Sequence, residues 1–391
     1  MAAPPVAVPG PVLSTPVLAS TPPSDAGMRA ELNARLDSIM STGIAEGAAP
    51  GGALVVGRYG KVVHRKGYGR LDTLATSAPV DASSLYDMAS LTKVIATTTA
   101  AMILEEQGLL DLERTVASYL PEFNAPDKAT ITVRHLVEHR GGLEAFAALY
   151  RDTKGRDEYL AKINSRPVRA EPGGTMVYSD WDLILLQIII ERLTGQTLDR
   201  FTAERIFAPL GMSSTMFNPD SATYWTRVAP TEIDSVRGGL VVGKVHDENA
   251  HAMGGVAGHA GLFSTANDLA VFAQMMLNGG EYSGVRILKP QTIARWTSVQ
   301  SKISSRALGW DTPSKGSSAG KFFSARSFGH TGFTGTSIWM DPERGLFVIL
   351  LTNRVNPTRE NTRHIPLRRD VADAVQSSIL DAPLINWEVS R

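Results

Sequence analysis

Cysteine is absent from this chain of 391 residues. Its absence excludes disulfide bonds, thiolate nucleophiles and cysteine-ligated metal sites, and it leaves the redox compartment open. Net charge is lacking as well, because 39 Lys and Arg balance 39 Asp and Glu. A chain without an excess of either sign has no electrostatic preference for nucleic acid or for an anionic membrane surface, so we expect neither as a partner.

Long apolar runs are also missing. A membrane-spanning helix needs about 18 consecutive apolar residues. The longest candidate, "LILLQIII" at 183–190, is much shorter and runs directly into Glu191 and Arg192. We therefore expect no membrane span.

The first 27 residues contain neither Lys nor Arg, and prolines interrupt each of their apolar stretches. A signal peptide needs a basic start and an unbroken apolar region, so this segment does not match one as written. We interpret residues 1–27 as a flexible Pro/Ala/Ser-rich segment, consistent with what remains after a signal is removed, and residues 28–391 as one domain. The expected location is the periplasm or the outside of the cell, with the cytoplasm as the alternative.

Two hairpins are predicted near the two ends of the domain. The stretch "GGALVVGRYGKVVHRKGYG" (51–69) predicts two strands joined by a tight turn, and "TSIWMDPERGLFVILLTNR" (336–354) predicts a second pair. Helices are expected between them, one starting at Asp180 as its N-cap and one opened by Ser264 or Thr265. The segment "RRDVADAVQSSIL" predicts a closing amphipathic helix.

This arrangement predicts an α+β fold. An antiparallel sheet is built from both ends of the domain, from about residues 50–85 and 325–380, and is flanked by helices. A mostly helical lobe is inserted at about residues 108–300.

A serine and a lysine stand one helical turn apart in "DMASLTKVIATTTAAMILEEQG" (87–108). On a helix, Ser90 and Lys93 share a face, so the ammonium would lie beside the hydroxyl and assist its deprotonation. Desolvating a lysine in so apolar a helix is costly unless the charge has a partner or a task. A second Ser-x-x-Lys match, at Ser318 and Lys321, overlaps "GSSAG", but no strand precedes it and no helix follows, which favours a solvated loop.

Two further motifs follow in order, Tyr178-Ser-Asp180 and His330-Thr331-Gly332. Ser-x-x-Lys, Tyr-x-Asp and His-Thr-Gly at these separations resemble the three motifs of the serine β-lactamase and penicillin-binding protein superfamily. The resemblance is greatest to its class C-like branch, which includes DD-peptidases, D-aminopeptidases and β-lactamase-like esterases. The segments "HLVEHRGGL" and "AGLFSTANDLAVF" are also similar to segments of that family, and the resemblance extends over about residues 30–380.

The resemblance implies a role for each motif. Ser90 would be the acylated nucleophile, Lys93 its activating neighbour, and Tyr178 the proton shuttle, working as a phenolate or through the lysine. The backbone N–H groups of Ser90 and Phe333 would form the oxyanion hole. The wall that holds the substrate would be supplied by His330, Thr331 and Gly332.

The chain departs from the class C pattern at two positions. Asp180 stands where those enzymes have Asn, and His330 stands where they have Lys. A neutral histidine and an added carboxylate should hold anionic substrates less well, which favours neutral esters or amides, or a substrate with a free amine. We also expect Asp180 to contact Lys93 and keep it protonated.

Two other patterns suggest metal chemistry. "HLVEH" places His135, Glu138 and His139 in the order found in inverted zinc peptidases, although it lacks a third ligand and a glycine pair follows at once. "VHDENAHAMGGVAGHAG" (245–261) is rich in His, Asp and Glu and could bind a cation. Its glycines favour instead a loop packed near the site, with His259 as the substrate neighbour.

The sequence therefore predicts a serine hydrolase that acts through an acyl-enzyme on an ester or amide, as a carboxylesterase or D-amino-acid peptidase with at most weak β-lactamase activity. Its substrate would be a small molecule or a cell-wall peptide, with no cofactor and no metal. The alternatives are a protein that binds penicillin or cell-wall peptides with slow or no turnover, and the zinc peptidase. The oligomeric state is left open.

Overall fold

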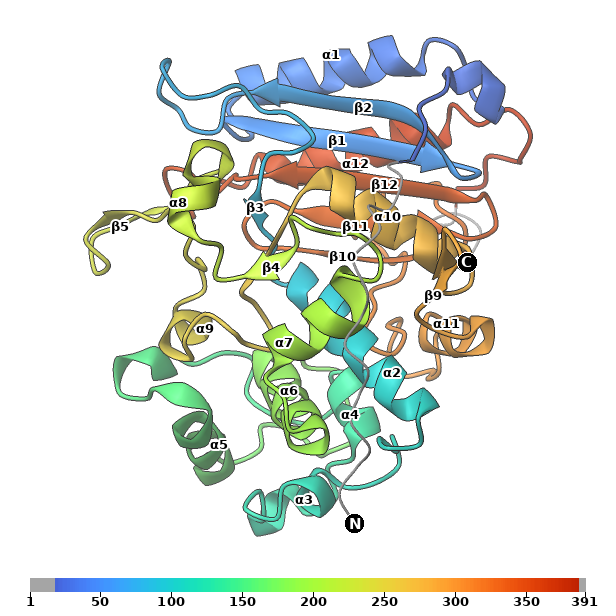
Figure 1. The fold of residues 1–391 in the computed structure, drawn as a ribbon. Coiled ribbons are helices and arrows are strands. Elements are labelled where there is room, and N and C mark those ends of the chain that lie inside the picture. The colour runs from blue at the N-terminus through green and yellow to red at the C-terminus, as the bar shows by residue number, and fades with distance from the viewer. Residues whose placement is uncertain (1–17, 387–391) are drawn as a thin grey trace.

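The computed structural model describes residues 18–386. A five-stranded antiparallel sheet, in the order β10-β11-β12-β1-β2, forms one layer of the molecule, and a mostly helical lobe lies beneath it in Figure 1. The strands of this sheet come from both ends of the chain: β1 (Gly51–Arg58), β2 (Lys61–Gly69), β10 (Phe328–Thr331), β11 (Ser337–Asp341) and β12 (Leu346–Thr352). The predicted fold class is confirmed.

The helices lie between these two sets of strands and on the faces of the sheet. The α-helices are α1 (Leu32–Ala45), α2 (Thr99–Glu106), α3 (Val116–Tyr119), α4 (Val133–Val137), α5 (Gly155–Ser165), α6 (Asp180–Thr194), α7 (Leu198–Thr202), α8 (Ser221–Tyr224), α9 (Glu248–Ala252), α10 (Ala266–Leu277), α11 (Pro290–Trp296) and α12 (His364–Gln376). Two π-helical segments, Lys93–Thr98 and Ala203–Phe207, precede α2 and follow α7.

Short strands and 3-10 turns complete the structure. A three-stranded sheet, in the order β3-β7-β4, lies at the junction between the main sheet and the helical lobe. The short strands are β3 (Tyr86–Asp87), β4 (Met216–Phe217), β5 (Ile233–Asp234), β6 (Gly239–Leu240), β7 (Leu262–Ser264), β8 (Glu281–Tyr282) and β9 (Val285–Arg286). The 3-10 turns are Pro23–Ala26, Pro126–Lys128, Leu149–Arg151 and Trp225–Arg227.

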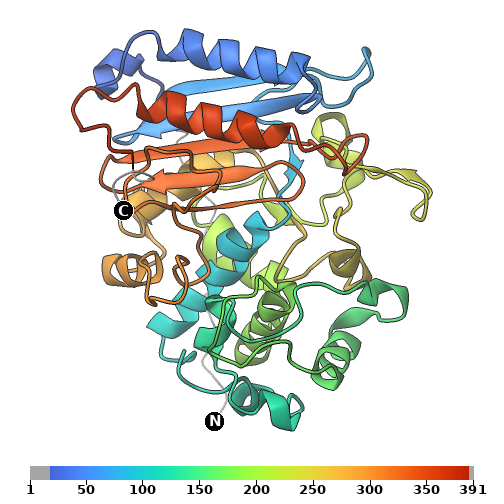
Figure 2. The ribbon, with the colours of Figure 1, turned by 180° about the vertical axis from the view of Figure 1, so that it is seen from behind.

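The sheet is buried on both faces because β1 alternates between two hydrophobic cores. Ala53 and Val55 pack with the core that includes the helical lobe, whereas Leu54 and Val56 pack with the core under α1 and α12. This is the period-two pattern of a strand covered on both sides. Figure 2 shows α12 across the outer face with α1 beside it, and α10 covers the opposite face.

The structure corrects the expected N-cap of α6. The cap is Ser179, whose hydroxyl accepts a hydrogen bond from the N–H of Trp181, and Asp180 is the first helical residue. For α10, Thr265 is the cap, as one of the two candidates predicted. No helix among the described residues has the length and apolarity that crossing a membrane requires.

The predicted flexible segment is only partly described. Residues 1–17 lie outside the described residues, whereas Leu18 is buried and Ser20 forms a β-bridge with Val62 of β2. The second part of the segment, up to residue 27, is therefore packed against the domain. Sequence composition alone did not predict this packing, because segments rich in proline and alanine occur both as flexible chain and packed against a domain.

Candidate active site

Ser90 lies in a tight turn that connects β3 to the buried helix. Consecutive i→i+3 hydrogen bonds, from the N–H of Leu91, Thr92 and Lys93 to the carbonyls of Met88, Ala89 and Ser90, form this turn. Ala89 has a positive φ of 46°, a conformation that costs a non-glycine residue about 1 kcal/mol or more. The Asp87 carboxylate accepts a 2.8 Å hydrogen bond from the Ala89 N–H and helps to hold this backbone.

Lys93 is the first residue of the π-helical segment, and its side chain is only 1% exposed. Its Nζ lies 2.9 Å from Ser90 Oγ, 2.7 Å from Asp180 Oδ1 and 3.1 Å from the His259 carbonyl oxygen. Burial by itself would lower the pKa of Lys93. The charge and hydrogen-bonding oxygens of Asp180 and Tyr178 outweigh burial and raise the pKa above its usual range, so the lysine is an ammonium at neutral pH.

Tyr178 lies between two cations. Its ring centroid is 5.0 Å from Lys93 Nζ and 5.0 Å from Arg306 Cζ. The ring also packs on His139, at 4.6 Å between centroids, and on His330, at 5.9 Å. Tyr178, two residues before α6, thus places its phenol beside the Ser90 and Lys93 pair.

His330, on β10, is neutral, and its hydrogen bonds determine which nitrogen carries the proton. Nδ1 donates to the Thr331 carbonyl oxygen at 2.8 Å, so Nε2 is the acceptor for the Arg306 guanidinium at 3.3 Å. Burial, and then the nearby charge of Arg306, lower the pKa of His330 well below its usual range. The positive charge at this wall therefore belongs to Arg306, which the sequence analysis missed.

The segment after β10 approaches the Ser90 turn closely. A Cβ at Gly332 would come within 2.5 Å of the Met88 carbonyl oxygen, so only glycine fits there without a shift. Within residues 18–386, neither the Ser90 N–H nor the Phe333 N–H donates to a protein acceptor. These are the two donors that the sequence analysis expected in an oxyanion hole, and both residues line one cavity.

That cavity has a volume of about 280 Å³ and contains most of the predicted site residues. Its lining includes Ser90, Tyr178, Asp180, His259 and Phe333. Lys93 and His330 lie behind this lining, at 1% and 3% exposure, and Thr331 is half-buried. The structure thus brings the three motifs together.

The histidine-rich segment 245–261 packs against this site, as predicted. His259 Nε2 lies 2.9 Å from Asp247 Oδ1, while its carbonyl oxygen accepts from Lys93. Asp247 also caps α9, and although burial opposes it, the charge and hydrogen bond of His259 lower the pKa of this carboxyl.

Asp180, Asp247 and His259 are the three residues of the described chain whose ligand atoms lie close enough together to hold a metal ion, within 4.8 Å of one another. The Lys93 ammonium already contacts Asp180 at 2.7 Å. A fixed positive charge at this position opposes a cation.

The residues of the zinc-peptidase alternative do not converge. His135 accepts from the Thr132 N–H in a capping interaction, and Glu138 pairs with Arg140 at 2.7 Å. His139, with a positive φ of 54°, lies beyond the end of α4, and its Nδ1 contacts Asp182 at 3.1 Å. These three side chains are therefore not arranged to bind one zinc ion.

The second Ser-x-x-Lys match, at Ser318 and Lys321, is also not placed as a catalytic pair. Ser318 accepts a hydrogen bond from the Trp339 indole, and the Lys321 side chain is exposed. The structure has no helix at this position, which agrees with the predicted loop.

Comparison with known proteins identifies the family. A family model described as Beta-lactamase matches residues 36–373. A protein of Escherichia coli (strain K12), provisionally named a D-alanyl-D-alanine carboxypeptidase, is 34% identical over 380 residues, which cover 87% of this chain and 86% of the relative.

Two solved structures share the fold. One is EstCE1, described as a hydrolase with promiscuous acyltransferase activity. It has a TM-score of 0.71 at 22% identity, and the match covers 88% of this chain and 98% of the EstCE1 chain. A penicillin-binding protein homologue from Caulobacter crescentus has a TM-score of 0.71 at 21% identity, with coverage of 90% and 99%. The predicted resemblance is confirmed. The chain belongs to the β-lactamase family, within the superfamily of serine β-lactamases and penicillin-binding proteins.

Proposed function

We propose that this member of a hydrolase family is a serine hydrolase that forms an acyl-enzyme on Ser90. The observation that carries the proposal is the buried group in which Lys93 Nζ lies 2.9 Å from Ser90 Oγ and 2.7 Å from Asp180 Oδ1. An ammonium held there by a carboxylate stabilises the developing serine alkoxide. An ion pair buried this deeply is costly for stability alone, which also favours a task in catalysis.

The mechanism requires a base other than Lys93, because its raised pKa keeps it protonated. We assign this task to Tyr178, whose ring faces both Lys93 and the cavity. Its phenolate accepts the Ser90 proton as Oγ forms the bond to the substrate carbonyl. The same proton passes to the leaving group as its bond to that carbon breaks, and water then hydrolyses the ester on Ser90 by the reverse route.

The N–H groups of Ser90 and Phe333 supply the oxyanion hole in this proposal. Both lack a protein acceptor among the described residues and both residues line the cavity. A fixed donor of this kind is worth roughly 3 kcal/mol of activation free energy.

The favoured substrate is an amide that carries a free carboxylate, as at the end of a D-alanyl peptide. Arg306 supports this choice, because its guanidinium contacts His330 and Tyr178 and is 13% exposed. The name of the Escherichia coli relative points to the same substrate class. Such a substrate occurs in the cell wall, so the proposal also favours a location outside the cytoplasm.

A neutral ester is the second candidate. Two aromatic side chains, Phe146 and Phe333, line the cavity and are each 50% exposed, which provides an apolar rim for an acyl or alcohol group.

Two serine variants test the nucleophile. Ser90→Ala should abolish hydrolysis of a p-nitrophenyl ester and of a D-alanyl-D-alanine peptide, and should remove covalent labelling by a fluorophosphonate and by penicillin. Ser318→Ala, the matched control on the second motif, should keep all four. Loss of a nucleophile lowers the rate by several orders of magnitude. Intact-mass spectrometry reports the adducts.

The same measurement separates the alternatives. A stable penicillin adduct without turnover of any substrate would favour the binding protein. Labelling of Ser90→Ala that maps to Ser318 would overturn the proposed site.

A further inference from the structure

Arg368, on α12, contacts the peptide group that carries one of the two proposed oxyanion donors. A terminal nitrogen of its guanidinium, Nη2, donates to the Gly332 carbonyl oxygen at 2.8 Å and to the Thr336 carbonyl oxygen at 2.7 Å. The Gly332 carbonyl and the Phe333 N–H belong to the same peptide group. The arginine thus binds the opposite end of the group whose N–H has no protein acceptor within residues 18–386.

The planarity of this peptide group links its two ends. The bond between Gly332 and Phe333 is trans, and in a trans peptide the C=O and the N–H point in opposite directions. A carbonyl held by Arg368 on the side of α12 therefore directs the Phe333 N–H away from that helix. Phe333 lines the cavity that contains Ser90, so fixing the carbonyl also fixes the donor at the site.

The charge of the guanidinium also strengthens this donor. Hydrogen bonds to a charged group are about twice as strong as neutral ones, and neighbouring hydrogen bonds polarise one another. A cation at the Gly332 oxygen draws electron density toward it and leaves the Phe333 N–H more positive. At the other proposed donor, the Ser90 N–H, the carbonyl of the same peptide group is that of Ala89, which accepts from the neutral Thr92 N–H at 3.0 Å.

Arg368 is buried without a countercharge. It is 8% exposed and forms no ion pair with any residue that the structure describes. Burial, and then the nearby charge of Arg354, lower the pKa of the Arg368 guanidinium. A buried cation without a carboxylate is costly, and an apolar side chain would often stabilise the same position better. This cost favours a task at the site over a role in packing.

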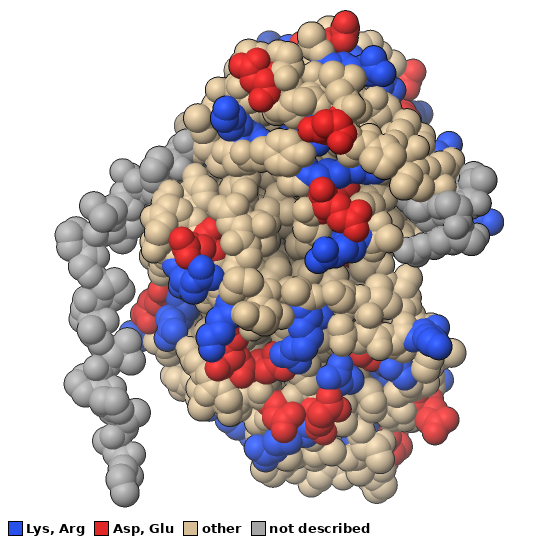
Figure 3. All heavy atoms as spheres, turned by 90° about the vertical axis from the view of Figure 1, so that its right-hand side faces the viewer, with Lys and Arg blue, Asp and Glu red and all other residues tan. Residues whose placement is uncertain are grey.

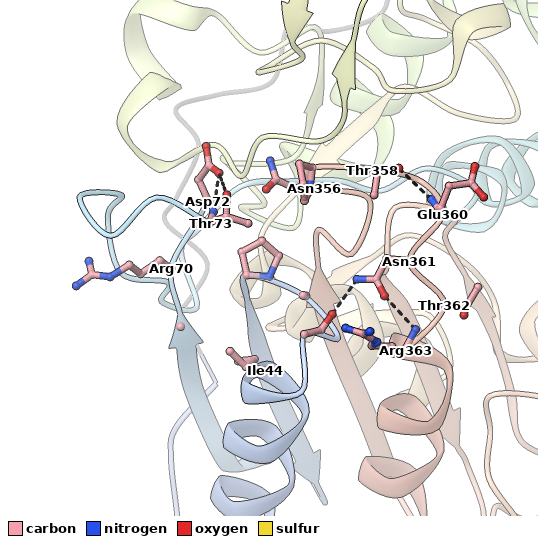
Figure 4. Close-up of a pocket in the computed structure, with 15 residues that line it drawn as sticks. Ile44, Arg70, Asp72, Thr73, Asn356, Thr358, Glu360, Asn361, Thr362 and Arg363 are labelled. Atoms are coloured by element: carbon pink, nitrogen blue, oxygen red, sulfur yellow. Dashed lines mark hydrogen bonds between the residues drawn. The ribbon is translucent and has the colours of Figure 1, made fainter.

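The segment before α12 is itself fixed, which gives Arg368 a firm base. The Asn361 carboxamide donates to the Gly47 carbonyl oxygen at 2.9 Å and accepts from the Arg363 N–H at 3.1 Å (Figure 4). The same segment lines a cavity of about 800 Å³ at the end of the main sheet. On α12, Leu367 packs in the core under α1 and α12. The helix therefore holds the guanidinium in a defined position.

The loop that Arg368 contacts is also joined to the turn of the proposed nucleophile. Thr334 Oγ1 donates to the Asp87 carbonyl oxygen at 2.7 Å, and Thr336 Oγ1 donates to the Met88 carbonyl oxygen at 3.1 Å. These bonds and those of the arginine hold the two proposed donors at a fixed separation.

We propose that Arg368 is a positioning residue of the oxyanion hole, which holds and polarises the peptide group between Gly332 and Phe333 so that the Phe333 N–H stabilises the oxyanion. The inference rests on the proposed function, because an oxyanion forms only if Ser90 attacks a carbonyl group. Arg368 acts through the peptide group and does not line the cavity.

The test begins with Arg368→Met, which keeps much of the side-chain bulk but has no donor. It should lower kcat for a p-nitrophenyl ester by about tenfold to 100-fold while KM changes by less than about threefold, because a misplaced and weakened donor acts on the transition state. Arg368→Lys keeps the charge without the planar set of donors and should retain more activity than the methionine variant.

The matched control is Arg369→Met. Arg369 is the next residue on α12 and also donates to a backbone carbonyl, that of Ser317, which does not line the cavity. This variant should keep both kinetic constants.

Inhibition by phenylboronic acid separates positioning from a general loss of structure. The tetrahedral boronate on Ser90 mimics the transition state, so its affinity depends on the oxyanion hole more than that of the ester does. The Ki should rise by about tenfold or more in Arg368→Met while KM for the ester stays within about threefold. Where the melting temperature shows that the methionine variant does not fold, Arg368→Lys should show a smaller rise in Ki, of about threefold or more, again without a matching rise in KM.

Unchanged kcat and Ki in a folded Arg368 variant, a rise in KM alone, or an equal loss in Arg369→Met would overturn this inference and leave the proposed function standing. A wild-type protein that neither hydrolyses the ester nor takes up a fluorophosphonate on Ser90 would instead overturn the proposed function, and this inference with it.

Discussion

At the scale of single residues, the site depends on the pairing of Lys93 with Asp180. Burial is the largest influence on the pKa of the lysine and acts to lower it, so the ammonium persists only because Asp180 and Tyr178 oppose burial. Asn in place of Asp180 would supply a hydrogen bond but no charge. The departure from the class C motif thus changes which groups at the site are charged.

Asp180→Asn should remove this countercharge and allow burial to lower the pKa of Lys93. In wild type, the raised pKa keeps the lysine charged from acid to mildly alkaline pH. In the variant, the lysine should lose its proton at lower pH, so kcat/KM for a neutral ester should fall by about tenfold or more as pH rises above neutrality. Activity on the cephalosporin nitrocefin, relative to the ester, should rise because a repulsive carboxylate is gone.

The measurement is a pair of pH profiles of kcat/KM for wild type and variant. Asp157→Asn, an exposed position on α5, is the matched control. Identical profiles with an unchanged ratio of the two activities would show that Asp180 only begins a helix.

The proposed function gives Arg306 the task of binding the carboxylate of a peptide substrate. Arg306→Gln should raise KM for a D-alanyl-D-alanine peptide by roughly 10- to 100-fold, because a charge-assisted contact to its carboxylate is lost. A neutral p-nitrophenyl ester should change by less than about threefold. The exposed Arg205→Gln is the control, and equal losses on both substrates would assign Arg306 a structural role instead.

At the scale of elements, the sequence predicted what depends on local patterns. The strand-like runs and the turn residues between them in residues 51–69 and 336–354 predicted both hairpins of the main sheet. The predicted approach of Tyr178 and His330 to Ser90 came from the family resemblance, since their separation along the chain carries no distance information.

The missed features depend on tertiary contacts. Arg306 lies in no motif, and only the packing of residues 301–310 beside β10 brings it to His330. The regular helix expected at Ser90 is instead a turn that leads into a π-helical segment, Lys93–Thr98, ahead of α2, and no local pattern in the sequence indicates this.

The segment after β12 links two elements of the site through Arg354. Its Nε donates to the Phe333 carbonyl oxygen at 2.7 Å, and its guanidinium lies 4.2 Å from the centroid of the Phe333 ring. The same side chain donates to the carbonyls of Arg359 and Asn361. It thus holds Phe333 through its carbonyl, one peptide group after the N–H that is proposed for the oxyanion hole.

Arg354→Lys should lower kcat by about tenfold to 100-fold while KM changes by less than about threefold, because a misplaced oxyanion donor weakens the transition state more than the bound substrate. Lysine keeps the charge but not the planar set of donors. Steady-state kinetics with the ester give both constants. Arg363→Lys, on the same segment but with its contact to Glu46, is the control, and a change in KM alone for Arg354→Lys would contradict the positioning role.

At the scale of the whole molecule, strands from both ends of the chain form one sheet and leave the site at its junction with the helical lobe. Ser90, the proposed nucleophile, follows β3, while His330 lies on β10 and Phe333 lies just after it. On the face shown in Figure 3, Lys and Arg are interspersed with Asp and Glu, without a broad region of one sign. Buried contacts join the outer helices α1 and α12 to the sheet.

One such contact joins α1 to β2 through His64. Its ring nitrogens lie 3.0 Å from Asn33 Oδ1 and 2.7 Å from Tyr68 Oη. Burial lowers the pKa of His64 to about 4, and Asp37 opposes this only in part. A histidine with a lowered pKa contributes stability that is complete above its unfolded value, near 6.5, and is lost as pH falls through about 4.

His64→Gln should therefore change how stability depends on pH. Near pH 7, the variant should be less stable than wild type by about 1 kcal/mol, because the imidazole contacts are replaced imperfectly. Between about pH 7 and pH 4, wild type should lose up to about 3 kcal/mol of its own stability, since its unfolded state binds a proton that the folded state does not, and the order of the two proteins should reverse. Glutamine does not titrate, so the acid limb of the variant should be shallower. Urea unfolding at a series of pH values measures the free energy of unfolding of both proteins.

Tyr68→Phe is the control, because it removes one contact of His64 but keeps the titrating ring, and it should retain most of the wild-type slope of stability against pH. Parallel curves for wild type and His64→Gln would mean that the buried imidazole is protonated in the folded state as readily as in the unfolded chain.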